Sequence, residues 1–517
     1  MSKLLKILGV AVSVCSTVHP RSVVSNQTFF SIRPHFQTGM PERVSFFRND
    51  LLDETQGIGG AFETVVYGGQ IDNIGAGKIA RFFLPGGCTA CCLNVREFNP
   101  ALEANPVNTE DGSTTKDLEA RHFNIHTVNE NFVSRVCIRP EHKVFGIGFA
   151  YKQVLTRRCD GAARFWFELG FPVERVENRI RVSEMVENNG GGARNEIGLD
   201  DSSRVGTMRE ALKQNNWLFG KIDSKCHVEW GVADVELKIG YNSITCDTCT
   251  LSSYLGVVIP TGTKVRSHIL FEPVIGNNHH FAFLLGNTIG FELWKKSCYN
   301  LSMYVDGVTR YLFRNHQIRS FDLIGRPWSR YMEVYRTPED AATAAATSNP
   351  NSGTSGINVF TQCVEVSAHL SANFNTGFVL SWQRDCASWV AEFGYNFFAR
   401  QAEVVELEGN TSISTVALKG VNGNGTTTAA RTIKNNFQQS VFTFAERYQQ
   451  LTNCDIDLES AAHPATLSYT LYASLGYKWE RECPLFVAFG GSYEFAVNEI
   501  NTTPDRWLVW GKFGFTF

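Results

Sequence analysis

In LSYTLYASLGYKW, residues 467–479, apolar side chains recur at every second position. One face carries Leu467, Tyr469, Leu471, Ala473, Leu475, Tyr477 and Trp479, and the other face carries mostly polar or small residues. A strand points successive side chains to opposite faces, whereas a helix with a period of 3.6 residues would mix these two sets. The alternation therefore predicts a strand with two chemically different faces.

The same alternation recurs along the chain from residue 142 onward. The further segments are 145–151, 165–173, 235–241, 251–259, 281–293, 301–313, 378–382, 389–397, 485–497 and 507–517. Together with 467–479 they predict eleven strands.

The connections between these strands differ in length in a regular way. Counted from the C-terminus, every second connection is short: 480–484, 385–387, 295–300, 243–249 and 156–163. The others, 498–506, 408–466, 314–373, 260–279 and 175–227, are mostly long. A strict alternation of short turns and long loops is typical of a transmembrane antiparallel up-and-down β-barrel, whose short turns face the periplasm.

A barrel with both chain ends on the periplasmic side needs an even number of strands. We therefore expect an all-β fold with about twelve strands, and residues 132–139 are the nearest segment for the twelfth. Alternatively, 61–68 and 79–85 add a hairpin and make fourteen.

The N-terminus has the pattern of an export signal over residues 1–25. Lys3 and Lys6 precede an apolar run that is too short to span a bilayer. Residues 26–130 are expected to form a periplasmic segment that is either a plug or a first hairpin, and residues 131–517 the barrel.

Composition excludes several other classes of protein. The chain has 517 residues with 48 Lys and Arg against 51 Asp and Glu, so no bulk positive charge is available for nucleic acid. The mean hydropathy is -0.15 and no apolar run reaches about 18 residues after the N-terminus, which excludes transmembrane helices. Only 19% of residues are charged while 12% are aromatic, as suits alternating strands in a membrane.

The last residues, WLVWGKFGFTF, end on the alternating aromatics Phe513, Phe515 and Phe517. This ending resembles the C-terminal assembly signal of bacterial outer-membrane β-barrel proteins of the porin-like type, although Gly511 lies one position from the usual glycine. The resemblance covers roughly residues 130–517 and implies the barrel assembly machinery as a partner.

The positions that alternate with the apolar stripes are expected to face the lumen. They are Glu168, Asp234, Glu236, Lys238, Glu292, Asp306, Arg310, Glu392, Arg400, Lys478, Glu494 and Lys512. So many charges in a dry core would be prohibitive, which favours a water-filled pathway with a weak preference for cations. The alternative is that the charges pair across strands and fill a closed barrel.

Fourteen cysteines in an exported chain favour disulfides over thiol chemistry. No cofactor and no metal site is expected. No Ser/His or Asp/His group of the kind that barrel phospholipases and proteases need is apparent in the spacing, so we expect no enzymatic activity.

We therefore predict a porin-like outer-membrane channel for passive diffusion of small solutes, integral to the cell outer membrane after export and signal-peptide cleavage. The alternatives are a transporter of hydrophobic solutes with an N-terminal plug, and a structural or surface-interaction barrel without conductance. The expected partners are membrane lipid, the barrel assembly machinery and small solutes, with homo-oligomer formation left open and no nucleic acid.

Overall fold

The structure is a computed structural model of the 517-residue chain. It describes residues 26–46, 59–85, 91–96, 117–125, 127–129, 131–157, 163–192, 205–246, 248–347, 353–384, 386–409, 413–419, 448–479, 483–496 and 503–517. The expected signal peptide, residues 1–25, lies outside these ranges.

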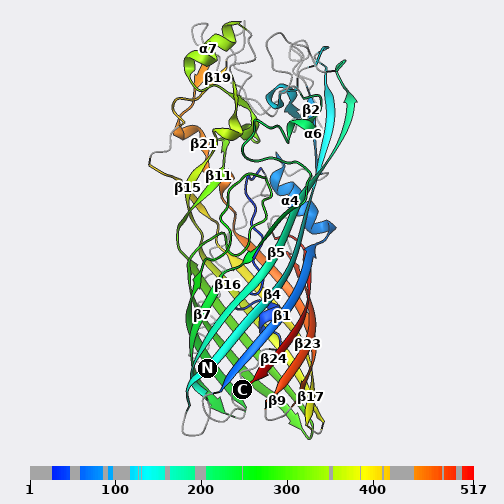
Figure 1. Ribbon diagram of the computed structural model, residues 1–517, viewed down its shortest axis with the longest axis vertical. Helices are drawn as coiled ribbons and strands as arrows, with labels where there is room; N and C mark the ends of the chain where they lie inside the picture. Colours follow the sequence, from blue (N-terminus) through cyan, green and yellow to red (C-terminus); the bar gives the residue numbers. More distant parts are fainter. Residues whose placement is uncertain are drawn as a thin grey trace.

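A closed barrel of twelve antiparallel strands occupies one half of the described molecule (Figure 1). Its strands are β1 (Gly60–Ile71), β4 (Val133–Arg157), β5 (Ala163–Asn188), β7 (Val235–Cys246), β8 (Cys249–Ile259), β9 (Ala282–Lys296), β10 (Tyr299–Leu312), β16 (His369–Arg384), β17 (Ala387–Arg400), β22 (Thr466–Trp479), β23 (Leu485–Phe495) and β24 (Arg506–Thr516). Strand β1 pairs with β24 on one side and with β4 on the other, which closes the cylinder. The predicted all-β barrel and the count of twelve are confirmed.

The twelfth strand is not the segment we expected. It is β1, which contains residues 61–68, whereas 132–139 belongs almost entirely to the long strand β4. Residues 79–83 lie in helix α4 (Asn73–Phe83), so the hairpin that would have made fourteen strands does not form. Only the closure of the ring identifies β1, because the C-terminal strand β24 needs a neighbour and 60–71 pairs with it.

Strand β4 continues without interruption through Pro140. The amide of Ile138 donates to the carbonyl of Cys91, next to β2. Residues two apart on a strand direct their backbone groups to the same side, so position 140 also faces the edge of β4 that pairs with β1 and β2. On that side β1 ends at the pair Gln70 and Lys143, and β2 begins at Cys137. Pro140 therefore lies in a gap where no ladder bond is required, which is where a strand tolerates proline.

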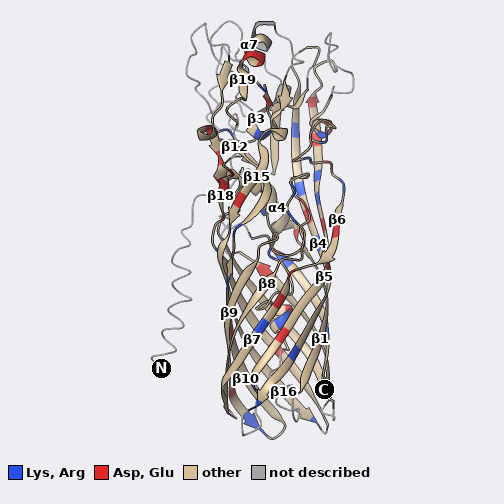
Figure 2. Ribbon diagram, turned by 60° about the vertical axis from the view of Figure 1, so that its left-hand side comes forward, with Lys and Arg blue, Asp and Glu red and all other residues tan. Residues whose placement is uncertain are grey.

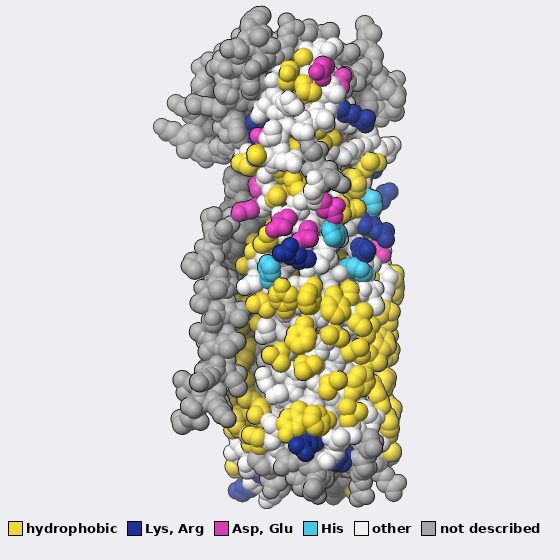
Figure 3. Space-filling model, turned by 90° about the vertical axis from the view of Figure 1, so that its left-hand side faces the viewer, with side chains coloured by type: hydrophobic (Ala, Val, Ile, Leu, Met, Phe, Trp, Pro, Cys, Tyr) yellow, Lys and Arg dark blue, Asp and Glu magenta, His cyan; other side chains and the backbone are white. Residues whose placement is uncertain are grey.

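Apolar side chains cover the outside of the barrel in a broad belt (Figure 3). Large hydrophobic residues on this surface are strongly exposed, among them Phe393 and Leu475, and Phe489 reaches 69%. A closed cylinder with such a belt satisfies its backbone hydrogen bonds internally and suits a hydrocarbon environment. The barrel is therefore a transmembrane barrel of the outer-membrane type.

Above the barrel, the long loops pack into a second layer that extends the molecule (Figure 1). Two apolar clusters hold it together, one around Phe83 and Trp328 and the other around Phe321 and Val364. Its elements are β2 (Cys92–Arg96), β3 (Asp117–Glu119), η3 (Ala120–Phe123), α6 (Met208–Ala211), β6 (His227–Val232), β11 (Asn315–Ser320), β12 (Asp322–Leu323), η5 (Ser329–Tyr331), β13 (Glu333–Val334), α7 (Pro338–Thr347), β14 (Thr354–Ser355), η7 (Gly356–Asn358), β15 (Thr361–Ser367), β18 (Val404–Leu407), β19 (Ala417–Lys419), β20 (Tyr448–Gln450), η8 (Asn453–Asp455), β21 (Ile456–Asp457) and η9 (Leu458–Ala461).

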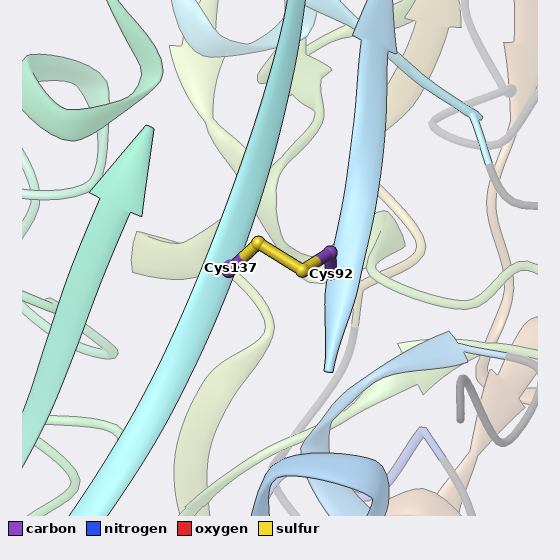
Figure 4. Close-up of a disulfide and its surroundings, with 2 residues drawn as sticks. All are labelled: Cys92 and Cys137. Atoms are coloured by element: carbon purple, nitrogen blue, oxygen red, sulfur yellow. A yellow bond between two sulfur atoms is a disulfide. The ribbon is translucent and has the colours of Figure 1, made fainter. Parts of the chain in front are cut away.

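In this layer a disulfide joins Cys92 of β2 to Cys137 of β4 (Figure 4).

Across the described ranges, no helix has both the length and the apolar character needed to cross a membrane.

Candidate functional site: the occupied lumen

The N-terminal segment, residues 26–46, runs lengthwise through the barrel (Figure 1, dark blue). At the long-loop end the amide of Gln27 donates to Phe82 O at 3.0 Å, and the amide of Thr28 donates to Ser460 O at 2.9 Å. Deeper in the barrel the amide of Phe46 donates to Glu392 Oε2 at 2.6 Å. The segment therefore begins at the long-loop end and passes down among the inward-facing side chains of the wall.

Arg33 attaches the upper part of the segment to the wall. Its guanidinium donates to Asn396 at 3.1 Å and to Glu494 at 3.3 Å, and it also contacts Asn373. Arg506 completes this group because it forms an ion pair with Glu494 at 2.5 Å and donates to the carbonyl of Arg33 at 3.0 Å. Every charge in this cluster thus has an opposite charge or a dipole beside it, as burial requires.

Arg43 makes the central attachment. Its two terminal nitrogens bind two different carboxylates, Glu236 at 2.6 Å and Glu168 at 2.7 Å. Glu236 also accepts from the amide of Thr38 at 2.9 Å and from Arg310 at 3.1 Å, and Lys238 binds Glu168 at 2.6 Å. Because all these groups are buried, loss of one partner would leave an uncompensated charge in the lumen.

Between these two attachments the chain turns at Gly39. This residue has φ +87, and a Cβ added there would lie 2.7 Å from Val308 Cγ1 and 2.9 Å from Asn373 Cβ. Its carbonyl accepts from the side-chain amides of Asn375 at 2.8 Å and Asn396 at 3.2 Å. Both the backbone conformation and the available space therefore require glycine.

The lower end of the segment forms the short helix α2 (Pro41–Val44), which begins with proline at its first position. Lys512 of β24 caps the helix end by donating to the carbonyls of Arg43 at 3.1 Å and Ser45 at 2.5 Å. The same lysine binds Glu63 of β1 at 3.2 Å. The strands that close the barrel are thus tied directly to the segment inside it.

Glycines in the wall make room for three side chains of the segment. A Cβ at Gly148 would overlap Phe36, one at Gly170 would overlap Arg43, and one at Gly476 would overlap Phe46. The inner surface of the wall is shaped to the segment that it holds.

A cavity of about 500 Å³ remains below the segment. Arg43 and Phe46 border it on one side, and it reaches the β9–β10 turn at Ser297 and Cys298. Charged side chains from several strands line it, including Lys152 and Glu292. In the described part of the lumen nearer the long-loop end, two cavities beside Arg33 hold only about 30 and 20 Å³. The space is therefore concentrated at the short-turn end.

The structure places the twelve residues expected to face the lumen as follows. Six contact residues 26–46: Glu168, Glu236, Arg310, Glu392, Glu494 and Lys512. Three others line the cavity with contacts to the wall: Lys238, Glu292 and Asp306. Lys478 also lines the cavity. Asp234 accepts from the amide of Asn277 at 2.8 Å, and buried Arg400 lies beside Glu403. All are buried except Glu292, which is half-buried.

Sequence analysis missed part of the lumen. Glu63 was overlooked because β1 was not assigned as the twelfth strand, and Arg506 because the last strand was started one residue later. Residues 26–46 lie within the segment 26–130 that was expected to be a plug or a first hairpin, but they carry no alternation, so no periodic signal showed which part of it enters the lumen. The density of charged and aromatic residues in SIRPHFQTGMPERVSFF, 31–47, is the signal that was available.

The terminal aromatics Phe513, Phe515 and Phe517 alternate on the outward side of the barrel, and Phe513 and Phe517 are exposed. The carbonyl and amide of Phe517 bond to Gly60 at the start of β1. They therefore lie at the seam that closes the barrel. Their recognition by an assembly machinery stays a prediction.

No protein-family model matches the chain, and no curated protein matches its sequence. Similar solved structures include an outer membrane channel from Pseudomonas putida F1, 9% identical, covering 91% of this chain and 99% of that one, with a TM-score of 0.34. Another is the translocator domain of the autotransporter NalP from Neisseria meningitidis, 9% identical, covering 90% of each chain, with a TM-score of 0.28. Likenesses this weak assign no function to this chain.

One expectation is corrected by the comparisons. We expected no enzyme, yet the similar structures include the outer membrane protease OmpT from Escherichia coli, 6% identical, covering 90% of this chain and 99% of that one, with a TM-score of 0.23. A barrel of this class can carry catalytic groups that meet only across strands, so the absence of a spaced motif excludes nothing. The same low identity assigns no enzymatic activity to this chain.

Proposed function

We propose that the chain is an outer-membrane channel that is closed by its own residues 26–46 and admits small polar solutes when this segment leaves the lumen. The observation that carries the proposal is the two ion pairs from Arg43 to Glu168 of β5 and Glu236 of the neighbouring strand β7, which fix the segment to the wall beside the large cavity. These bonds hold the segment by charge rather than by a continuous apolar core.

Buried ion pairs suit a removable plug better than an apolar core does. Water that enters beside the segment solvates both members of each ion pair. This solvation compensates for much of the Coulomb energy that is lost when the two charges separate. The wall that is left behind carries charged side chains such as Glu168, Glu236 and Lys238, so it is wettable once the segment is gone. Passive diffusion of small polar solutes follows from such a lumen.

The test is conductance of the refolded full-length chain in a planar bilayer, compared with a variant that lacks residues 26–46. We expect rare openings for the full chain and steady conductance steps for the deletion. A second variant, Gly148→Leu with Gly170→Leu, keeps the segment but fills the space of Phe36 and Arg43, so it also conducts.

The matched control is Gly307→Leu, because a Cβ at Gly307 meets nothing nearer than 3.9 Å. Each variant is first shown to be a folded barrel by its heat-dependent shift in gel mobility. If the folded deletion variant is silent, the channel is refuted and a structural or surface-interaction barrel without conductance is left.

Transport of hydrophobic solutes is the second function, and one wall of the cavity favours it. Phe46, Val379, Val390 and Phe486 form an apolar cluster beside the charged groups. An apolar molecule that copurifies with the full chain and is lost on Phe486→Ser would support this function over polar diffusion.

A further inference from the structure

The outward face of the β4–β5 hairpin changes abruptly from apolar to basic at the upper edge of the apolar belt. On β4 the outward residues Ile147 and Phe145 are followed by Lys143, whose side chain is 57% exposed. On β5 Val173 is followed by Arg175. Trp230 of β6 pairs with Arg175 and is 62% exposed, as expected for an aromatic residue at the membrane interface.

Above this edge, positive charge accumulates over four consecutive pairs of the hairpin. The outward pairs are Phe145 with Arg175, Lys143 with Glu177, Glu141 with Arg179, and Arg139 with Arg181. They contain five basic and two acidic residues, a net charge of +3 by subtraction. Figure 2 shows blue segments along these two strands above the barrel.

The two carboxylates do not neutralise this surface. Glu177 is shared between Arg175 at 2.8 Å and Lys143 at 4.0 Å, and Glu141 binds Arg181 at 2.7 Å. The guanidinium of Arg179 donates to the carbonyl of Ser224, which carries no net charge. The hairpin therefore keeps an outward positive potential after its internal ion pairs are formed.

The side of the barrel around β11, β15 and β18 carries a different charge pattern. Above the belt around β11, β15 and β18, Arg314 is accompanied by Glu365, Glu406 and Glu408, and Figure 3 shows acidic and basic side chains mixed there. A generic ring of basic residues at the interface would not produce this difference.

The height of the hairpin charges matches the headgroup layer of a bilayer. Successive outward residues of a strand are about 6.6 Å apart, and strand tilt shortens this distance along the membrane normal. The polar layer on each side of the hydrocarbon is about 5–8 Å thick. Lys143 thus lies at the depth of lipid phosphates, with Arg179 at the outer margin of this layer and Arg139 and Arg181 above it.

We infer that the outward face of the β4–β5 hairpin binds the phosphate groups of membrane lipid in the leaflet on the long-loop side. Arginine matches phosphate oxygens with two parallel donors, and lysine adds a point charge. This inference does not depend on the proposed channel, because it concerns the outer wall and not the lumen.

The test titrates the full chain, folded in a non-ionic detergent, with diphosphorylated lipid A and measures binding by native mass spectrometry. The variant Lys143→Gln, Arg179→Gln, Arg181→Gln removes three of the five bases. Each charge near an anionic lipid is worth about five-fold in binding. We therefore expect at least a ten-fold weaker association of lipid A.

The control variant, Lys264→Gln, Arg266→Gln, Arg314→Gln, removes the same charge from exposed positions outside the hairpin. It should bind lipid A within two-fold of the unmodified chain. Equal binding by the hairpin variant, or equal loss in both variants, would overturn the inference. So would displacement of lipid A by 10-fold excess inorganic phosphate, which would indicate a site for free phosphate.

Discussion

Gly39 shows how one residue determines whether the segment fits the lumen. Its positive φ and its contact with Val308 and Asn373 leave no room for a side chain. The surrounding asparagines, Asn375 and Asn396, bind its carbonyl and hold the turn at a fixed height. Sequence alone could not assign this role, because a glycine in an aperiodic stretch has many explanations.

We predict that Gly39→Ala loosens residues 26–46 without opening the barrel. The left-handed conformation costs about 1–2 kcal/mol for a residue with a Cβ, and overpacking adds about 1–3 kcal/mol. Trypsin should then cleave after Arg43 in the folded protein at a higher rate. The control Gly77→Ala, on α4 with nothing near its Cβ, should leave cleavage unchanged; equal rates in both variants would contradict the role of Gly39.

His463 links stability to pH at the long-loop end. Burial, together with nearby Arg400, lowers the pKa of this imidazole to about 3 from an ordinary value of 6.5. The unfolded chain therefore takes up a proton between pH 6.5 and 3 that the folded chain does not. Stability is fully present above pH 6.5 and falls as the pH drops through this window.

We predict that the free energy of unfolding decreases by up to about 1.4 kcal/mol per pH unit below pH 6 through this residue. Urea unfolding followed by tryptophan fluorescence at pH 6.5, 5.5 and 4.5 measures the slope. His463→Gln should reduce it, whereas replacement of the exposed His268 should not. An unchanged slope in His463→Gln would refute this assignment.

At the scale of elements, long strands carry the membrane part into the layer above it. Strand β4 has 25 residues and β5 has 26, so both extend well beyond the belt. Proline does not end either strand, because Pro140 lies where β1 and β2 leave a gap and Pro172 lies where β6 gives way to β7. Only the neighbouring strands decide whether a proline is tolerated at such a position.

The disulfide between Cys92 and Cys137 fastens β2 to β4 across 45 residues of chain. We predict that Cys92→Ser with Cys137→Ser destabilises the upper layer by about 4 kcal/mol, since a loop of this length gains that much conformational entropy in the unfolded state. The upper layer should then become sensitive to protease while the barrel keeps its shift in gel mobility. Dithiothreitol should reproduce this in the unmodified chain, and an upper layer as resistant to protease in the double variant as in the unmodified chain would contradict the assignment.

At the scale of the whole molecule, the segment inside the barrel changes the charge that solutes would meet. Arg33 and Arg43 neutralise Glu494, Glu168 and Glu236 in the closed form. Their removal leaves an excess of carboxylates among the lumen residues predicted from sequence, seven acidic against five basic.

We therefore predict that the variant lacking residues 26–46 prefers cations. The reversal potential in a tenfold KCl gradient gives the ratio of cation to anion permeability, which should exceed one. Glu168→Gln with Glu236→Gln in the same background should bring it closer to one, whereas Glu365→Gln outside the lumen should not. A ratio below one in the deletion variant would contradict this prediction.

Periodicity along the chain was sufficient to predict the barrel, the eleven alternating strands and the inward or outward side of most wall residues, because a strand fixes the face of each side chain by local geometry alone. The order of long and short connections added the up-and-down topology. The identity of the twelfth strand, the course of residues 26–46 through the lumen and the pairing of Arg43 with Glu168 and Glu236 depended on the tertiary structure. These features join residues that are far apart in the chain. Their partners are selected by the closure of the ring, the shape of the wall and the pairing of buried charges, and no local pattern in the sequence records these.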